Sequence, residues 1–247
     1  MPLDWLTACP IAHRGLHDAA AGVIENTASA FTAAIEANYA IECDLQISAD
    51  GEAMVHHDDA LGRLTEGSGR LADMSASAIK AVRFKASADR ILTLGELCEL
   101  TGGRATLVIE LKSHFDGDLR LVQRAAQVLA GYRGPAALMS FDPDMVAAVR
   151  AIAPKLTRGI VAERDYSHPE WQALSVWRRR SMAHLLHFPR TCPHFVAYWV
   201  GALPAAAPLI TRYVFGCPLL TWTVRNPDQV GRAKRWADQM IFEGWRP

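Results

Sequence analysis

Eight short runs rich in apolar residues recur along this chain, and alanine- and leucine-rich segments with helical spacing lie between most of them. Strands that alternate with helices indicate a parallel sheet, and eight strands close a (β/α)8 barrel. A barrel of this kind takes about 250 residues, and the chain has 247. The expected strands cover residues 10–13, 40–47, 106–112, 136–141, 157–162, 195–200, 218–224 and 239–244. We therefore expect one (β/α)8 domain over residues 1–247, with an open doubly wound sheet as the alternative.

The stretch after the second expected strand breaks this alternation. Asp50-Gly51 stands between two extended runs, which is a hairpin signal, and residues 58–91 are rich in turn formers. Long irregular segments of this kind are insertions more often than repeating units of a barrel. We expect residues 49–92 to be a small insertion that follows the second barrel strand.

The composition limits the possible binding partners and the cellular compartment of the protein. The 26 basic and 26 acidic residues give a formal net charge of zero, which carries no electrostatic footprint of nucleic acid binding. The five cysteines include no Cys-x-x-Cys pair, so we expect neither a disulfide framework nor a zinc site. The N-terminal residues lack the pattern of a secretory signal, and no apolar run reaches the ~18 residues of a spanning helix. These observations favour a cytoplasmic location.

The strand expected over residues 40–47 carries two carboxylates in an otherwise apolar run. Because alternate residues of a strand face opposite sides, Glu42, Asp44 and Gln46 share one face, and apolar residues cover the other. Two ionised carboxylates on one inward face repel each other and lose hydration. They need a cation, a bound metal or shared protons.

The strand over residues 106–112 repeats the arrangement, because Glu110 and Lys112 share one face and apolar residues form the other. For a single strand, a structural salt bridge would be the simpler interpretation. Two successive strands with the same acidic inner face favour a functional site. Three carboxylates without cysteine ligands favour a hard divalent cation, Mg²⁺ or Ca²⁺, over zinc.

Histidines and an arginine stand at the ends of the early strands, where barrel active sites lie. His13 can move a proton near neutral pH, and Arg14 can bind an anion through two parallel hydrogen bonds. His56 and His57 follow the hairpin, and strand alternation predicts that only one of them faces the site. Glu25 and Asn26 are expected to brace the first loop and cap its helix.

At this point the sequence resembles the glycerophosphodiester phosphodiesterase family. The segments that carry the resemblance occur in the family's order: AHRG (12–15), ENTASAF (25–31), IECDLQISADG (41–51), VHHDDALGRLTEGSG (55–69), LTLGELCEL (92–100), VIELK (108–112) and TWTVRN (221–226). Agreement is strongest in the first half of the chain. The resemblance implies a (β/α)8 barrel with a small insertion after the second strand.

The resemblance also implies roles for eight residues: three ligands of one divalent cation, an acid–base pair, two phosphate contacts and one residue beside the glycerol. Glu42, Asp44 and Glu110 are the implied metal ligands, and His13 and His57 are the implied acid–base pair. Arg14 and Lys112 are the implied phosphate contacts, and Trp222 is the residue beside the glycerol. His57 rather than His56 matches, because the family pattern places Asp directly after the histidine. The implied reaction is metal-dependent hydrolysis of a glycerophosphodiester to sn-glycerol 3-phosphate and an alcohol, through a cyclic phosphate.

Three other functions are compatible with parts of this pattern. A lysophospholipase D-like enzyme would share the implied residues and differ in the apolar surface around them. A glycosidase would use paired carboxylates but needs no histidines, Arg14 or Lys112. A barrel that only binds phosphate or metal would not require both His13 and His57.

The remaining expectations concern partners. A small-molecule substrate is expected, and no nucleic acid. Residues 171–188 mix aromatic side chains with three consecutive arginines, so peripheral membrane contact is conceivable, although an ordinary outer barrel helix is the simpler interpretation. The oligomeric state does not follow from the sequence.

Overall fold

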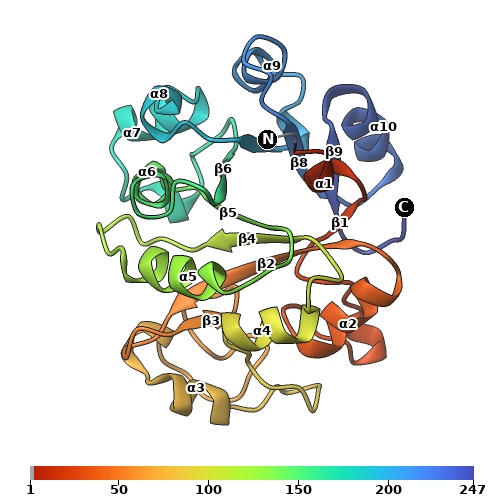
Figure 1. The fold of residues 1–247 in the computed structure, drawn as a ribbon, viewed down its shortest axis with the longest axis vertical. Coiled ribbons are helices and arrows are strands. Elements are labelled where there is room, and N and C mark those ends of the chain that lie inside the picture. Colours follow the sequence, from red (N-terminus) through yellow and green to blue (C-terminus); the bar gives the residue numbers. More distant parts are fainter. Residues whose placement is uncertain (1–2) are drawn as a thin grey trace.

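The computed structural model describes residues 3–247, which form a closed barrel of eight parallel strands with helices around it (Figure 1). The strand order is β1-β9-β8-β7-β6-β5-β4-β2, and pairing of β1 with β2 closes the ring. The strands are β1 (Ile11–Ala12), β2 (Ala40–Ile47), β3 (Ala53–Val55), β4 (Leu107–Leu111), β5 (Ala136–Ser140), β6 (Thr157–Ala162), β7 (Phe195–Trp199), β8 (Leu219–Val224) and β9 (Gln239–Phe242). The expected (β/α)8 barrel is confirmed, and the open doubly wound sheet is wrong.

Helices cover the outside of the barrel, and short 3-10 turns lie in the loops (Figure 1). The α-helices are α1 (Asp4–Thr7), α2 (Ala28–Glu36), α3 (Ala76–Ala81), α4 (Leu94–Thr101), α5 (Arg120–Ala130), α6 (Pro143–Ile152), α7 (Val176–Ala183), α8 (Phe188–Thr191), α9 (Ala206–Tyr213) and α10 (Pro227–Trp236). The 3-10 turns are η1 (Ala19–Ala21), η2 (Leu71–Asp73), η3 (Pro169–Trp171) and η4 (Val200–Ala202). Helix α7 lies within the basic aromatic stretch 171–188, as one of the outer helices.

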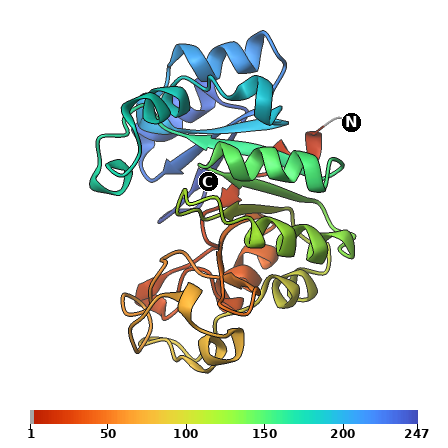
Figure 2. The same cartoon turned by 90° about the vertical axis from the view of Figure 1, so that its left-hand side faces the viewer.

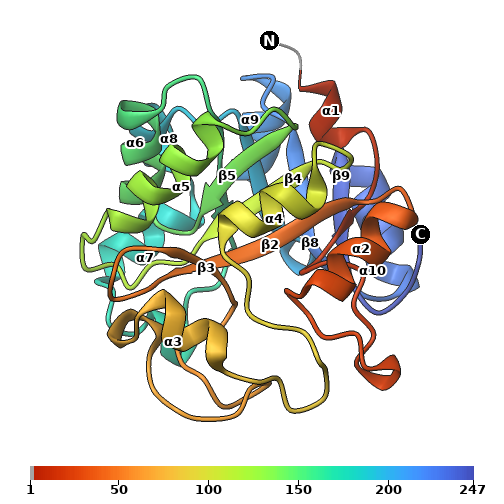
Figure 3. The ribbon, with the colours of Figure 1, turned by 60° about the horizontal axis from the view of Figure 1, so that its bottom comes forward.

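The expected insertion follows β2. Strand β3 pairs antiparallel with β2, and Gly51 adopts the left-handed conformation that the Asp-Gly turn requires, with φ +84°. The segment that continues through η2 and α3 lies at one end of the molecule (Figures 2 and 3). It has a small core of its own, in which Met54, Leu71 and Ile79 are fully buried.

The core has two parts that the strand pattern determines. Outward residues of β2 and β4, such as Leu45 and Ile109, pack beneath the surrounding helices. Inside the barrel, Val108 and Phe195 fill the interior, and Leu6 of α1 packs against them. The apolar side chains fill the interior, and the mouth at the carboxyl ends of the strands is left for polar side chains.

None of the helices within residues 3–247 combines the length and the apolar character that crossing a bilayer requires.

Candidate active site

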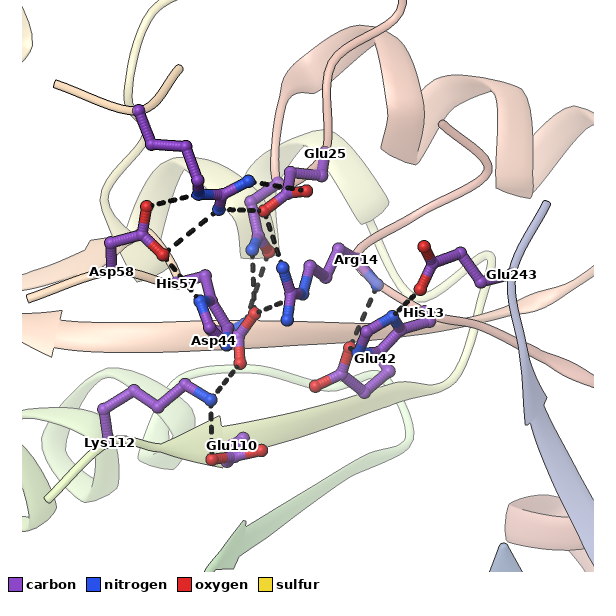
Figure 4. Close-up of polar contacts among 12 residues, drawn as sticks. His13, Arg14, Glu25, Glu42, Asp44, His57, Asp58, Glu110, Lys112 and Glu243 are labelled. Atoms are coloured by element: carbon purple, nitrogen blue, oxygen red, sulfur yellow. Dashed lines mark hydrogen bonds and ion pairs between the residues drawn. The ribbon is translucent and has the colours of Figure 1, made fainter. Parts of the chain in front are cut away.

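Three carboxyl groups meet at the barrel mouth. Asp44 on β2 lies opposite Glu110 on β4 in the parallel register, and Glu42 is two residues before Asp44 on the same face. One oxygen from each of the three groups lies within 4.8 Å of the others, and all three residues are buried (Figure 4). The shared inner face that the sequence predicted is therefore present.

Two cations partly balance this cluster. Lys112 Nζ lies 2.8 Å from Asp44 Oδ1 and 2.8 Å from Glu110 Oε1, and Arg14 Nε lies 3.3 Å from Asp44 Oδ2 (Figure 4). Burial disfavours the charge on Asp44, but Lys112 and the neighbouring cations outweigh it and lower the pKa of this carboxyl group.

The pKa of Glu42 shifts in the opposite direction. Burial, followed by the charges of Asp44 and Glu110, raises its pKa well above the ordinary value. A divalent cation among the three groups would remove this conflict between buried like charges. The donor set consists of oxygen atoms alone, so the residues present fit a hard cation.

The AHRG turn is built by backbone conformation. Arg14 has φ +58°, which turns its amide toward the site, and this N–H donates to Glu42 Oε2 at 2.9 Å. Gly15 follows with φ +79°, and a Cβ there would lie 2.9 Å from Ala30. Only glycine fits at this position without displacing helix α2.

His13 is held by a residue that the sequence analysis missed. Glu243, directly after β9, has Oε2 2.6 Å from His13 Nδ1 (Figure 4). The same oxygen lies 2.7 Å from an Arg225 nitrogen. Although burial favours the neutral acid, these contacts lower the pKa of Glu243 to about 2. The carboxylate therefore accepts, and Nδ1 of His13 carries the hydrogen. A closed barrel places the last strand beside the first, and this was the signal that could have found Glu243.

His57 forms a second pair of the same kind. Its Nδ1 lies 2.8 Å from Asp58 Oδ1, and Arg63 Nε donates to Asp58 Oδ2 at 2.6 Å (Figure 4). Burial, together with the charge of Lys112, lowers the pKa of His57 to about 4. Strand β3 ends at Val55, before both histidines, so strand alternation does not apply to them. His57 nevertheless lines the cavity, whereas His56 is buried and does not.

Glu25 and Asn26 also belong to this network. Glu25 Oε1 accepts from Arg14 at 2.7 Å and from Arg63 at 2.6 Å, and Asn26 Nδ2 donates to Asp44 Oδ2 at 2.9 Å. The capping role expected for Asn26 is wrong, because the cap of helix α2 is Thr27, whose side chain accepts from Ala30 N. The bracing role expected for Glu25 and Asn26 thus extends into the carboxylate site.

A cavity of about 920 Å³ opens at the barrel mouth, and among the residues that line it are Glu42, Glu110, Lys112, Arg14, His13 and His57. Trp222 lines it, and its Nε1 donates to Ala197 O at 3.1 Å. Trp171 and Trp199 line the cavity as well. The structure therefore brings the eight residues singled out from the sequence to a single mouth. It also places Glu243, Arg63 and several aromatic side chains there.

This fold and this oxygen-rich mouth define a (β/α)8 barrel with a carboxylate cluster that could hold a divalent cation. The model of the glycerophosphoryl diester phosphodiesterase family matches residues 13–244. The glycerophosphodiester phosphodiesterase of Caldanaerobacter subterraneus subsp. tengcongensis is 30% identical, over 94% of this chain and 93% of the relative. The chain therefore belongs to the glycerophosphoryl diester phosphodiesterase family and is a phosphoric diester hydrolase of that family.

Solved structures agree on the fold. A phosphodiesterase from Oleispira antarctica, in complex with the product sn-glycerol-3-phosphate, matches with a TM-score of 0.75 and 20% identity, over 94% of this chain and 91% of that one. The glycerophosphodiester phosphodiesterase from Thermotoga maritima matches with a TM-score of 0.70 and 21% identity, over 95% and 94%.

Proposed function

We propose that this enzyme hydrolyses glycerophosphodiesters to sn-glycerol 3-phosphate and an alcohol with one divalent cation, Mg²⁺ or Ca²⁺. The observation that carries the proposal is the pairing of two histidines with ionised carboxylates beside a cluster of three buried carboxyl groups. The product bound to the Oleispira antarctica phosphodiesterase supports the choice of substrate class.

Glu42, Asp44 and Glu110 would hold the cation. When bound, it supplies Lewis-acid stabilisation of charge on the phosphoryl oxygens. Arg14 and Lys112 bind the phosphate, because they present cationic N–H groups beside the carboxylates. Since both lie among anionic side chains, they stay charged when the substrate enters.

His13 and His57 act as the acid–base pair. In each, the carboxylate partner fixes the hydrogen on Nδ1, which leaves Nε2 to exchange a proton with the substrate. One histidine takes the proton of the substrate's glycerol hydroxyl as that oxygen attacks phosphorus. The other gives a proton to the departing alkoxide, and a cyclic phosphate and the alcohol result. Water then opens the ring while the two histidines exchange roles.

Trp222 lines the glycerol side of the cavity in this proposal. Arg225 and Thr223 lie at the same mouth, where they can contact glycerol hydroxyl groups. We place the enzyme in the cytoplasm, a location supported by its five cysteines, which are all free.

Release of sn-glycerol 3-phosphate tests the proposal. The substrates are glycerophosphocholine, glycerophosphoethanolamine and lysophosphatidylcholine, each with EDTA, Mg²⁺ or Ca²⁺. Metal-dependent release from the water-soluble diesters is the expected result. Turnover of the lysolipid alone, with lysophosphatidic acid as product, would assign the lysophospholipase D-like activity instead. His57→Ala should abolish turnover and leave metal binding intact, and retained turnover would remove His57 from the acid–base pair.

A further inference from the structure

Helix α9 and the turn after it present apolar side chains to the outside, where an outer helix ordinarily carries polar ones. Ile210, Tyr213 and Val214 share one face of the helix at spacings of three and four residues, and they are 50%, 65% and 70% exposed. Phe215 follows directly and is 61% exposed. We call these four residues the α9 patch.

Other outer helices show the ordinary pattern. Gln123 and Gln127 are exposed on α5, and Arg232 is exposed on α10. Since an aromatic side chain alone offers about 150–250 Å², the exposed area of the α9 patch is on the order of 400 Å². Apolar patches of this size on a monomer are often interaction sites.

The α9 patch lies at the end of the barrel opposite the mouth. The chain passes from the patch into β8, which begins at Leu219, whereas Thr223 and Arg225 near the carboxyl end of this strand line the cavity. The two ends of a barrel strand reach opposite faces of the barrel. A partner bound to the α9 patch therefore leaves the mouth open.

Basic side chains flank the α9 patch on the side of α10 (Figure 1). Lys234 and Arg235 in the last turn of α10 are exposed, and neither forms an ion pair with any residue within 3–247. Arg212 of α9 holds the two helices together, because its NH1 group donates to Trp236 O at 2.9 Å. The two free cations are thus close to the exposed face of α9.

A further cation lies on the side of α8. Phe215 stacks on Phe188 of α8, with ring centroids 5.2 Å apart, and exposed Arg150 donates to the backbone oxygen of Arg190 at 2.8 Å. A bond to a neutral carbonyl group leaves the guanidinium charge of Arg150 in place.

The nearby carboxylate does not cancel these charges. Asp238 follows α10, but Arg212 already pairs with it at 2.6 Å. The surroundings of the α9 patch therefore carry a positive charge, although the chain as a whole is neutral.

We propose that the α9 patch docks on an anionic lipid bilayer, with Tyr213, Val214 and Phe215 in the interface and Lys234 and Arg235 against the headgroups. Aromatic side chains favour the membrane–water interface, and each lysine or arginine near an anionic leaflet adds attraction. A second copy of the chain, docked patch to patch, would instead bring cations against cations. The inference does not depend on the proposed function, but the orientation suits a water-soluble substrate, because the mouth faces the water.

Co-sedimentation with vesicles tests the inference. Mixed vesicles of phosphatidylcholine and phosphatidylglycerol are compared with vesicles of phosphatidylcholine alone. We expect binding to the mixed vesicles to be at least about tenfold tighter, from the two free cations. Binding should weaken between ~0.1 M and ~1 M salt, because the screening length falls from about 10 Å to about 3 Å.

A matched pair of double variants locates the contact. Val214→Ser with Phe215→Ser should weaken binding to the mixed vesicles at least about tenfold, since both side chains lose their burial in the interface. Val176→Ser with Trp177→Ser is the control. These two residues are 56% and 71% exposed at the start of α7, which follows a loop that lines the cavity. The control should bind as the wild type does.

A third variant tests the charges. Lys234→Gln with Arg235→Gln should remove most of the preference for the mixed vesicles. Both side chains are exposed, so this variant keeps the test decisive if loss of the Phe215–Phe188 contact unfolds the first one. Thermal melts check that each variant folds.

Each outcome decides the matter. Absence of binding to the mixed vesicles, or equal binding to both kinds of vesicle, would overturn the inference. Loss of binding in the control alone would overturn it as well and assign the contact to α7. A wild-type dimer that Val214→Ser with Phe215→Ser converts to a monomer, measured by light scattering, would assign the α9 patch to a second copy and overturn the inference too.

Discussion

Glu243 Oε2 lies 2.6 Å from His13 Nδ1, although 230 residues separate the two in the chain. The barrel closes between them, because β1 pairs with β9 and the backbone N–H of His13 donates to Phe242 O at 3.0 Å. Each residue follows its strand directly, so closure of the barrel sets the imidazole against the carboxylate. The orientation of His13 therefore depends on the last strand of the fold.

Glu243→Ala should lower kcat about 10²-fold, at the lower end of what a positioned acid or base contributes, and change KM little. Without the carboxylate, the imidazole of His13 can rotate and take either tautomer. Glu243→Gln should recover part of kcat, because the amide oxygen can still accept from Nδ1. Steady-state kinetics at saturating metal measures both values. Equal losses in the two variants would show that the charge, rather than the hydrogen bond, is what matters.

Glu42→Gln should weaken binding of the divalent cation at least about tenfold. Replacing a residue that only hydrogen-bonds to a metal ligand already lowers metal affinity about 10–100-fold, and loss of a ligand itself should cost no less. In the absence of metal, the same substitution should raise the melting temperature, because it removes one of three neighbouring buried carboxyl groups. Calorimetric titration and thermal melts with EDTA measure the two effects. An unchanged metal affinity would remove Glu42 from the ligand set.

The strands and the inner carboxylates could be predicted from the sequence because both follow from local periodicity. All eight barrel strands are present with boundaries within two residues of those expected. Glu42 and Asp44 face inward, since alternation in a strand is a property of the chain itself.

What was missed from the sequence depends on contacts between distant segments. The partners Glu243 and Arg63 become visible only when the barrel closes and the insertion folds back on the first loop. The aromatic side chains at the mouth are similar, because Trp171 and Trp199 have no local pattern that separates a cavity-lining residue from a core residue. Their function depends on tertiary placement.

Arg63 ties the insertion to the acid–base pair. It donates to Asp58 at 2.6 Å and to Glu25 at 2.6 Å, and Asp58 in turn contacts His57. Arg63→Ala should lower kcat about tenfold, because Asp58 and with it His57 lose their fixed position. Arg63→Lys should rescue little, since one ammonium group cannot reproduce the guanidinium fork.

The matched control for this prediction is Arg70→Ala. Arg70 is in the same insertion, and its contact with Asp59 is exposed on both sides and 3.4 Å long. Its removal should leave kcat at the wild-type value. A wild-type kcat in Arg63→Ala would mean that the insertion does not position His57.

Protonation of His187 should make the free energy of unfolding depend on pH. It is buried just before α8, and neither ring nitrogen has a hydrogen-bond partner among the residues described. Burial, with a smaller effect of the Arg190 charge, lowers the pKa of His187 to about 4, from an ordinary value of 6.5. Because the unfolded chain binds the proton more readily, the stability that neutral His187 permits is present above pH 6.5 and is lost as the pH falls toward 4.

The expected loss is about 2 kcal/mol in the free energy of unfolding between pH 7 and pH 5, from the difference between the two pKa values. Urea unfolding of the metal-free protein at both pH values measures it. His187→Leu should reduce the loss by that amount, because a leucine side chain fills a similar volume and binds no proton. His184→Gln is the control, since His184 is exposed three residues earlier, and it should keep the wild-type pH dependence. If His187→Leu loses as much stability as the wild type over this interval, then His187 takes up its proton without unfolding the chain around it.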